Sequence, residues 1–225
     1  TLLLVAPAQA QQSVSATSPD GSIALTVGVN GEGRPSYSIS RNGAVLLAPS
    51  RLGFLFTDAL ALDRWLAIES HSETSVDTRW EQPWGERRFV RDHHNELLVV
   101  LREGADAHRR IAVRFRLFDD GVGFRYEFLD QAGWGTVHIQ DELTEFNIVP
   151  HGTAWWITGG DWNRYEQIYQ HTEIDAVSTA HTPITMRLDD GTHLAFHEAA
   201  LVDYAAMWVR RVDGQRFKAT LSPSS

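Results

Sequence analysis

The feature that most constrains this chain is an alternation of apolar and polar residues with a period of two. In residues 110–129, two alternating runs flank the turn residues Asp119, Asp120 and Gly121. Apolar side chains occupy every second position of these runs, at Ile111, Val113, Phe115, Leu117, Val122, Phe124, Tyr126 and Phe128. Successive side chains of a strand point to opposite faces of its sheet, so this pattern predicts a β-hairpin with one apolar face.

A second hairpin is predicted over residues 184–197, with its turn at residues 189–191. Its apolar positions are Ile184, Met186, Leu188, Leu194 and Phe196. The next position on the apolar side of the return strand is Glu198, a carboxylate. An unpaired charge at the end of a buried face is unfavourable, so this carboxylate must be paired, neutralised or bound to a metal.

The same alternation continues through most of the chain, whereas helical periodicity is almost missing. A chain of 225 residues, 43% of them hydrophobic, can bury one sizeable core, either as one large domain or as two small ones. No unit of fixed length repeats, which disfavours propellers and solenoids. The sequence therefore predicts an all-β fold of mainly antiparallel strands that form a two-sheet sandwich.

Two long segments break the alternation. Residues 57–97 mix aromatic, acidic and histidine residues, and residues 151–183 are rich in aromatic residues and interrupted by glycine. Long irregular segments within a compact β domain often carry function. We therefore expect irregular structure in both segments and functional residues among their side chains.

Charge and cysteine content exclude several classes of function. The formal net charge is −9 and the pI is about 5.5, and lysine and arginine are scattered, so no nucleic-acid partner is expected. The chain has no cysteine, which excludes disulfides, thiolate nucleophiles and cysteine-ligated zinc. Only histidine and carboxylate side chains remain as metal ligands.

Both ends of the chain indicate how the protein is processed or divided. The apolar opening TLLLVAPAQA ends in the small-x-small pattern of a signal-peptidase site, so residues 1–10 are interpreted as the remnant of a signal peptide and the protein as exported, to the periplasm. The alternative is a frayed apolar N-terminus. No later run approaches the roughly 20 apolar residues of a membrane-spanning helix. The closing TLSPSS follows a strand and is expected to mark a cut through a longer polypeptide.

Glu198 is the first candidate for chemistry. The ordinary alternative is a carboxylate at a strand end that faces solvent or pairs with Arg187 or His197. The other interpretation is a ligand for a hard cation such as Ca²⁺, which takes six to eight oxygen ligands. One glutamate cannot build such a site alone, so the remaining ligands would come from elsewhere.

Aromatic residues between positions 155 and 169 form the second candidate. A sugar-stacking platform and a buried core or domain interface are both compatible with Trp155, Trp156, Trp162, Tyr165 and Tyr169. Asp161 adds a carboxylate beside Trp162. The flat apolar face of an aromatic ring complements the C–H face of a pyranose, so these residues are kept as substrate or domain-interface candidates.

Histidine spacing argues against zinc. His193 and His197 lie four apart on a predicted strand, which is too far for both to chelate one ion easily. His93, His94 and His181 show no ligand spacing. The chain has no glycine-rich phosphate loop, no G-x-S-x-G and no H-E-x-x-H, so nucleotide-binding and metalloprotease functions are not expected.

Several stretches in order along the chain carry a family resemblance. They are SPDGSIALTV, PWGERRFVRDHHNEL, FRLFDDGVGFRYEF, DELTEF and TAHTPITMRLDDGTHLAFHEAALVDYA. Together they resemble the N-terminal domain of glycoside hydrolase family 97, the family of periplasmic α-glucosidases and α-galactosidases. The resemblance covers residues 11–225, and what makes it specific is the ordered combination of these stretches, which ends in HEAALVDY.

The resemblance implies a β-supersandwich of the galactose-mutarotase type, truncated here before a (β/α)₈ barrel that holds the catalytic residues. No catalytic residue is therefore expected in this chain. It also implies that Glu198 contributes a ligand to a Ca²⁺ site shared with the barrel. By position, Trp155, Trp156, Asp161, Trp162 and His197 would contact the substrate or the barrel.

The function expected from the resemblance is that of an N-terminal domain in an exported, calcium-dependent α-glycosidase, most simply an α-glucosidase acting on starch or malto-oligosaccharides. The fragment alone is expected to be inactive. The expected partners are an α-linked oligosaccharide substrate and the protein's own barrel. Two alternatives stay open, a stand-alone carbohydrate-binding module and a mutarotase-like epimerase, although the fold alone supports the second.

Overall fold

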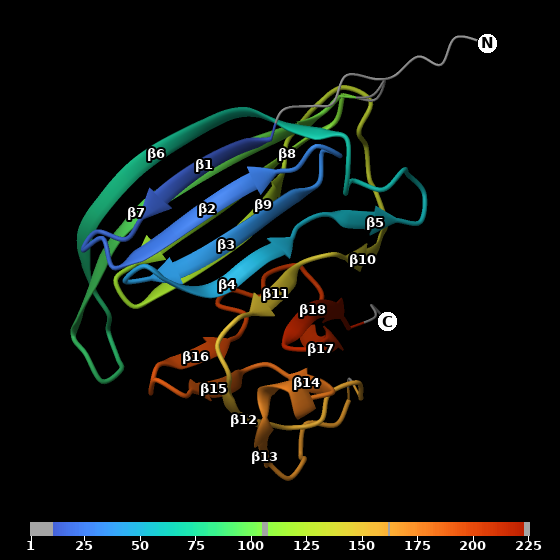
Figure 1. The fold of residues 1–225 in the computed structure, drawn as a ribbon. Coiled ribbons are helices and arrows are strands. Elements are labelled where there is room, and N and C mark those ends of the chain that lie inside the picture. The colour runs from blue at the N-terminus through green and yellow to red at the C-terminus, as the bar shows by residue number, and fades with distance from the viewer. Residues whose placement is uncertain (1–10, 105–107, 162, 223–225) are drawn as a thin grey trace. The chain divides into compact units, whose positions relative to one another are not determined.

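The computed structural model describes residues 11–104, 108–161 and 163–222. These residues form antiparallel strands and one 3₁₀ helix, without an α-helix, as the predicted all-β class requires (Figure 1). None of them belongs to a helix long and apolar enough to cross a membrane. The predicted signal-peptide remnant at residues 1–10 and the candidate Trp162 lie outside the described residues.

The chain divides into two compact units. Unit 1 comprises Thr1–Ala44 and Leu62–Thr136, and unit 2 comprises Val45–Ala61 and Val137–Ser225. The strands of unit 1 are β1 (Gln12–Thr17), β2 (Ile23–Val29), β3 (Pro35–Arg41), β6 (Leu66–Glu81), β7 (Phe89–Glu103), β8 (Arg110–Phe118) and β9 (Gly121–Phe128). β1, β2 and β3 pair in that order, and β6 to β9 form a four-stranded sheet in chain order. β1 and β2 contact strands of the second sheet, so unit 1 is a two-layer sandwich.

The predicted hairpin at residues 110–129 is confirmed as β8 and β9, and its apolar face lines the core of unit 1. Phe115 is fully buried, and its ring centroid lies 5.3 Å from that of Phe124 and 6.1 Å from that of Tyr37 on β3. Tyr37 and Phe124 are 5.3 Å apart. Aromatic side chains at these separations bury large apolar areas, so this cluster joins the two sheets of unit 1.

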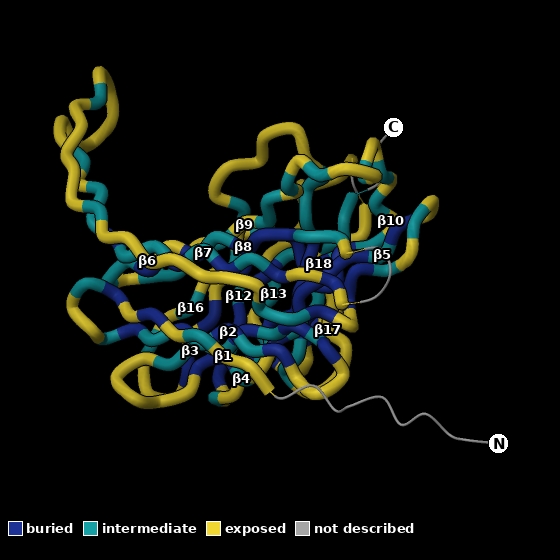
Figure 2. The backbone as a smooth tube through the Cα atoms, turned by 90° about the horizontal axis from the view of Figure 1, so that it is seen from above, coloured by how far each residue is buried: buried dark blue, intermediate teal, exposed yellow. Residues whose placement is uncertain are grey.

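The expectation of irregular structure in residues 57–97 is wrong, because β6 and most of β7 occupy this segment as one long hairpin. Beyond its first residues β6 is almost wholly exposed, and Figure 2 shows the outer part of the hairpin as an exposed arm of unit 1. The arm has solvent on both faces, so its sequence does not alternate between apolar and polar residues. Only the inner half of β7, from Leu97 to Glu103, shows the alternation of a half-buried strand.

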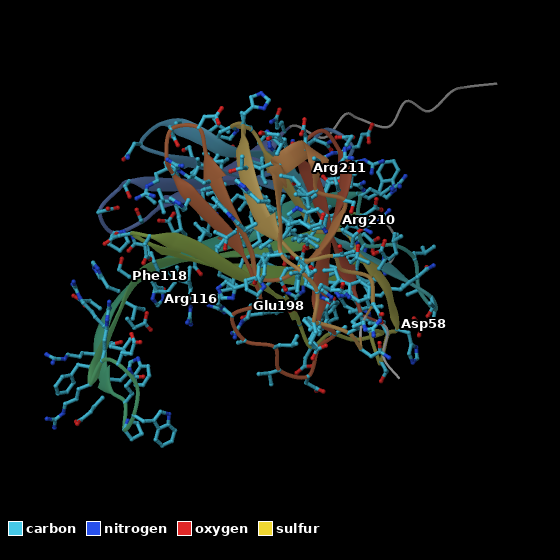
Figure 3. All side chains as sticks on the ribbon, turned by 90° about the horizontal axis from the view of Figure 1, so that it is seen from below. Asp58, Arg116, Phe118, Glu198, Arg210 and Arg211 are labelled. Carbon is cyan, nitrogen blue, oxygen red and sulfur yellow. The ribbon has the colours of Figure 1, made fainter. Side chains whose placement is uncertain are left out.

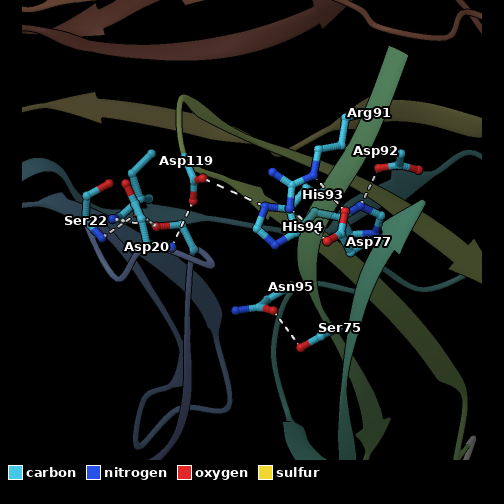
Figure 4. A network of polar contacts seen from close by, with 12 residues as sticks. Asp20, Ser22, Ser75, Asp77, Arg91, Asp92, His93, His94, Asn95 and Asp119 are labelled. Carbon is cyan, nitrogen blue, oxygen red and sulfur yellow. Dashed lines mark hydrogen bonds and ion pairs between the residues drawn. The ribbon is translucent and has the colours of Figure 1, made fainter. Parts of the chain in front are cut away.

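Polar contacts hold the turns of unit 1 together (Figure 4). The Ser18 hydroxyl donates to Asp20 Oδ1 at 2.6 Å, and the Ser22 N–H donates to the same oxygen at 2.8 Å. These donors, the Ser18 hydroxyl first, lower the pKa of Asp20 to about 2. The Asp20 N–H in turn donates to Asp119 Oδ1 at 2.9 Å. The β1–β2 turn is thereby fixed to the β8–β9 turn.

Unit 2 contains the remaining elements. They are β4 (Ala44–Arg51), β5 (Phe54–Phe56), β10 (Ile139–Glu142), β11 (Glu145–Ile148), β12 (Gly152–Trp156), β13 (Gln170–Glu173), η1 (Ile174–Ala176), β14 (Thr179–His181), β15 (Ile184–Leu188), β16 (His193–Phe196), β17 (Met207–Asp213) and β18 (Arg216–Leu221). β4, β11, β18, β17 and β14 pair in that order, and β5 pairs with β10. A separate four-stranded sheet has the order β13-β12-β15-β16.

A close approach between β12 and β15 depends on glycine. A Cβ added to Gly152 would lie 2.3 Å from the Arg187 carbonyl oxygen, well inside any normal contact. Gly152 shares its face of the pair with Ala154, Ile184 and Met186, which are fully buried. The segment from residue 151 to 183 is thus partly regular, because β12, β13 and β14 interrupt its loops.

Candidate functional site

The hairpin of β15 and β16 leads to Glu198, which follows β16, the edge strand of its sheet. Ile184, Met186 and Leu188 are buried, and Phe196 packs on Phe146 with ring centroids 4.6 Å apart. Glu198 follows two residues beyond Phe196, on the same side of the chain, and is half-buried (Figure 3). The strand pattern therefore brings a carboxylate into a position that an apolar side chain would otherwise fill.

Neutral groups hold the Glu198 carboxylate. Its Oε1 accepts a hydrogen bond from the Met207 N–H at 2.7 Å, and its Oε2 lies 3.4 Å from the Thr182 hydroxyl. That hydroxyl also lies 3.1 Å from the Met207 carbonyl oxygen. A threonine hydroxyl carries one hydrogen, so it cannot donate to Glu198 and to Met207 at once. Oε2 therefore keeps unused acceptor capacity.

The electrostatics of the site disfavour the charge on Glu198. Burial raises the pKa of this carboxyl above its ordinary value, against the hydrogen bonds from Met207 and Thr182, and the nearby Glu142 raises it further. Among the described residues Glu198 forms no ion pair, so the alternative in which it pairs with Arg187 is not seen. His197 is exposed and acts on Glu198 only as a weak nearby charge. A cation beside Glu198 would favour the charged carboxylate and so lower its pKa.

A second carboxylate, Glu142, lies in the same part of unit 2 at the end of β10. It is buried, and two hydroxyls donate to it, Thr144 to Oε1 at 2.6 Å and Tyr204 to Oε2 at 2.8 Å. Tyr204 lies near the C-terminal end of the segment from residue 198 to 207. Two side-chain hydrogen bonds therefore restrain this segment, one from the Met207 N–H to Glu198 and one from the Tyr204 hydroxyl to Glu142.

Sequence reasoning missed Glu142, Thr182 and Tyr204 as neighbours of Glu198. Tyr204 belongs to the HEAALVDY stretch and Glu142 to the DELTEF stretch, two of the stretches that carry the family resemblance. Their separation along the chain, 62 residues between Tyr204 and Glu142, gives no signal that they meet. Pairing of strands distant in sequence brings them together.

The aromatic candidates divide between core and surface. Trp156 is buried, 4% exposed, and its Nε1–H donates to the Thr172 hydroxyl at 3.1 Å. Trp155 is half-buried on the other face of β12, where it stacks on His171 with ring centroids 4.5 Å apart and nearly parallel planes. Trp156 is therefore a core residue, and His171 covers one face of the Trp155 ring. Asp161 is exposed in the loop that follows β12.

A row of three polar side chains crosses β14, β17 and β18. His181 pairs with Trp208, and Trp208 pairs with Thr220. Within the described residues, both His181 ring nitrogens, Trp208 Nε1 and Thr220 Oγ1 are buried without a hydrogen-bond partner. The Tyr165 ring covers His181, with 4.1 Å between ring centroids. Burial lowers the pKa of His181 and outweighs the nearby Arg164 backbone and the Asp161 charge, both of which raise it, so the imidazole is neutral at neutral pH.

This burial predicts a loss of stability in mild acid. The pKa of His181 is lowered from 6.5 in the folded state, so below that pH the unfolded chain binds more protons. The stability that neutral His181 contributes is fully present above about pH 6.5, and it is lost as the pH falls through the lower pKa of the folded state. We expect the melting temperature to decrease more between about pH 7 and about pH 5 in the wild type than in His181→Phe.

The control for this comparison is His197→Gln, because His197 is exposed. Its melting temperature should follow the wild-type pH dependence. Parallel curves for the wild type and His181→Phe, measured by thermal unfolding in matched buffers, would contradict the prediction.

No group of three or more histidine, aspartate or glutamate side chains suited to a metal ion is found within residues 11–104, 108–161 and 163–222. A metal at Glu198 therefore needs ligands from beyond this part of the chain. The Glu198 carboxylate itself suits a hard cation, because it offers oxygen, forms no ion pair among the described residues and has a free acceptor position on Oε2.

Comparison with protein families and with curated proteins finds related sequences. Residues 16–223 match the family model described as glycosyl-hydrolase 97 N-terminal. The chain is also similar to a retaining alpha-galactosidase from Bacteroides thetaiotaomicron, with 22% identity over 219 residues. The matched region covers 92% of this chain and 31% of that enzyme, so the chain spans about a third of its relative's length.

Solved structures share the fold. A glycoside hydrolase family 97 enzyme from Pseudoalteromonas sp. strain K8, in complex with panose, matches with 41% identity and a TM-score of 0.89. The match covers 93% of this chain and 32% of that one, and the acarbose complex of the same organism's enzyme gives the same values. A beta-arabinopyranosidase matches with 25% identity and a TM-score of 0.83, over 93% of this chain and 35% of its own.

Proposed function

This chain belongs to the glycosyl-hydrolase 97 family as its N-terminal domain, and on that premise we propose that it serves in an exported, Ca²⁺-dependent α-glycosidase to which it contributes Glu198 as a metal ligand. The observation that carries the proposal is the half-buried Glu198 carboxylate, held by neutral donors, without an ion pair and close to a second carboxylate, Glu142. A bound cation would stabilise the charged form that burial disfavours.

In this proposal the chain supplies one ligand and the catalytic domain supplies the others. Glu198 Oε2 faces no strong donor, so it can bind a cation while Oε1 keeps its hydrogen bond to the Met207 N–H. A bound Ca²⁺ would help to orient the substrate and stabilise charge that develops as the glycosidic bond breaks. Thr182 and Met207 fix the direction of the carboxylate, and the hydrolytic carboxylates belong to the rest of the protein.

The proposed substrate is an α-linked gluco-oligosaccharide. Support comes from the panose and acarbose complexes of the 41%-identical enzyme, since panose is a trisaccharide of α-linked glucose. The relative that is an alpha-galactosidase shares 22% identity with this chain. The higher identity favours α-glucosidase over α-galactosidase activity for the complete protein.

The carbohydrate-binding module receives less support than the leading proposal. This alternative uses Trp155, Trp156 and Trp162; Trp162 lies outside the described residues, and the side chains of Trp155 and Trp156 point to opposite faces of β12. Trp156 is buried, and His171 stacks on Trp155. Trp155 and Trp156 therefore pack within unit 2 and do not form an open stacking surface for a sugar.

Removal of Ca²⁺ tests the proposed function. We expect a chelator to lower hydrolysis of aryl α-glucosides by the complete protein at least about tenfold, and added Ca²⁺ to restore it, because ligation by Glu198 and the catalytic domain would organise the active site. Initial rates with and without chelator, and with Mg²⁺ in place of Ca²⁺, give the measurement. Full activity after exhaustive chelation would refute the metal requirement.

A further inference from the structure

The segment that carries Glu198 has two anchors of different kinds. Glu198 forms the first, through the hydrogen bond from the Met207 N–H. Tyr204 forms the second, through the hydrogen bond from its hydroxyl to Glu142 on β10. Residues 199–203 between them are exposed and belong to no strand. The second anchor restrains the exposed part of the loop, and the Ser222 N–H, which donates to the Ala206 carbonyl oxygen at 2.7 Å, restrains its C-terminal end.

The Glu142 carboxylate is buried and accepts hydrogen bonds from two hydroxyls. Its side chain is buried, 8% exposed, and both carboxylate oxygens accept short hydrogen bonds, at 2.6 Å from Thr144 and 2.8 Å from Tyr204. The neighbouring Leu143 N–H donates to the Gly53 carbonyl at 2.9 Å, and Glu142 pairs with Phe54 in the β5–β10 ladder. The carboxylate thus stands on a fixed backbone, whereas Tyr204 lies on a loop.

We infer that Glu142 is a positioning residue, which holds Tyr204 and thereby fixes the segment from residue 199 to 206 so that Glu198 is presented to the cation. The inference rests on the proposed function, because it assumes that Glu198 binds a metal. Glu142 acts in two ways. Its hydrogen bond restrains the loop, and its charge adds to the attraction for a cation at Glu198 as an outer-shell group does.

Three variants of the complete protein separate these effects. Tyr204→Phe removes only the hydroxyl and leaves Glu142 charged. Glu142→Gln keeps an acceptor for Tyr204, and its amide can donate to Thr144, but the charge is lost. Tyr169→Phe is the matched control, since Tyr169 is 66% exposed and its hydroxyl has no hydrogen bond in the described part of the chain.

The two measurements are calcium affinity by isothermal titration calorimetry and amide hydrogen exchange of residues 199–206 without Ca²⁺. For Tyr204→Phe we expect a dissociation constant raised about 10- to 100-fold and faster exchange. For Glu142→Gln we expect weaker binding with nearly wild-type exchange, and for Tyr169→Phe no change in either.

The outcomes distinguish this inference from the proposed function. Wild-type protein that binds no Ca²⁺, or a Glu198→Gln variant that binds it normally, would refute the proposed function and the positioning role together. If wild type binds and Glu198→Gln does not, Tyr204→Phe decides the inference. Unchanged affinity and unchanged exchange in Tyr204→Phe would overturn it, whereas faster exchange with weaker binding would support it.

Discussion

Glu198→Gln is expected to lower the Ca²⁺-dependent α-glycosidase activity of the complete protein at least about 100-fold, because loss of a direct metal ligand should exceed the 10- to 100-fold effects of outer-shell residues. Glutamine keeps the shape of the side chain and the acceptor for the Met207 N–H, so the fold should persist. Initial rates on aryl α-glucosides across a Ca²⁺ titration provide the measurement.

The same substitution should stabilise the protein in the absence of Ca²⁺. A glutamine amide can donate to the Thr182 hydroxyl, whose own hydrogen then goes to the Met207 carbonyl, and the repulsion from Glu142 disappears. Charge on Glu198 is disfavoured because its pKa is raised in the folded state, so the destabilisation appears as the pH rises above the ordinary value of 4.5. We expect a gain of about 0.5–1 kcal/mol, or roughly 1–4 °C in melting temperature.

Glu173→Gln is the matched control, because Glu173 is an exposed glutamate at the end of β13. It should change neither the Ca²⁺ dependence nor the melting temperature measurably. Full activity of Glu198→Gln would contradict its assignment as a ligand, and a lower melting temperature in the Ca²⁺-free state would contradict the electrostatic account of the site.

Phe115→Ala is expected to be the most destabilising single change in unit 1, at about 3–5 kcal/mol. Phe115 is fully buried between Tyr37 and Phe124, so alanine would leave a cavity where two sheets meet. Whole domains are stable by only about 5–15 kcal/mol, so the loss is a large fraction of the total. The melting temperature should fall by about 6–20 °C in thermal unfolding followed by circular dichroism.

Phe89→Ala is the control for size and chemistry, because Phe89 is 41% exposed at the base of the turn between β6 and β7. Its main contact is the Arg79 guanidinium, 3.7 Å from the ring centroid. Losing an exposed cation–π contact should alter stability by no more than about 1 kcal/mol. Equal destabilisation by the two substitutions would contradict the location of the core at Phe115.

Alternation predicted the hairpins that have one buried face and failed where that condition was absent. β8–β9 and β15–β16 were both located correctly, with their turns, because solvent lies on one side of each and packed side chains on the other. The strands of the β6–β7 arm were not predicted, because most of β6 is exposed on both faces. Strand pairing there depends on backbone hydrogen bonds, which leave no apolar pattern in the sequence.

The sequence by itself determined the fold class, the family and the position of Glu198, because each depends on local order along the chain: the period of two, the turn residues and an ordered set of stretches. Only the tertiary structure decided what surrounds Glu198. Glu142, Thr182, Tyr204 and Met207 come from separate strands and loops, and antiparallel pairing and side-chain packing bring them together. Burial and neighbouring charge are properties of that arrangement, so no reading of the linear sequence could supply them.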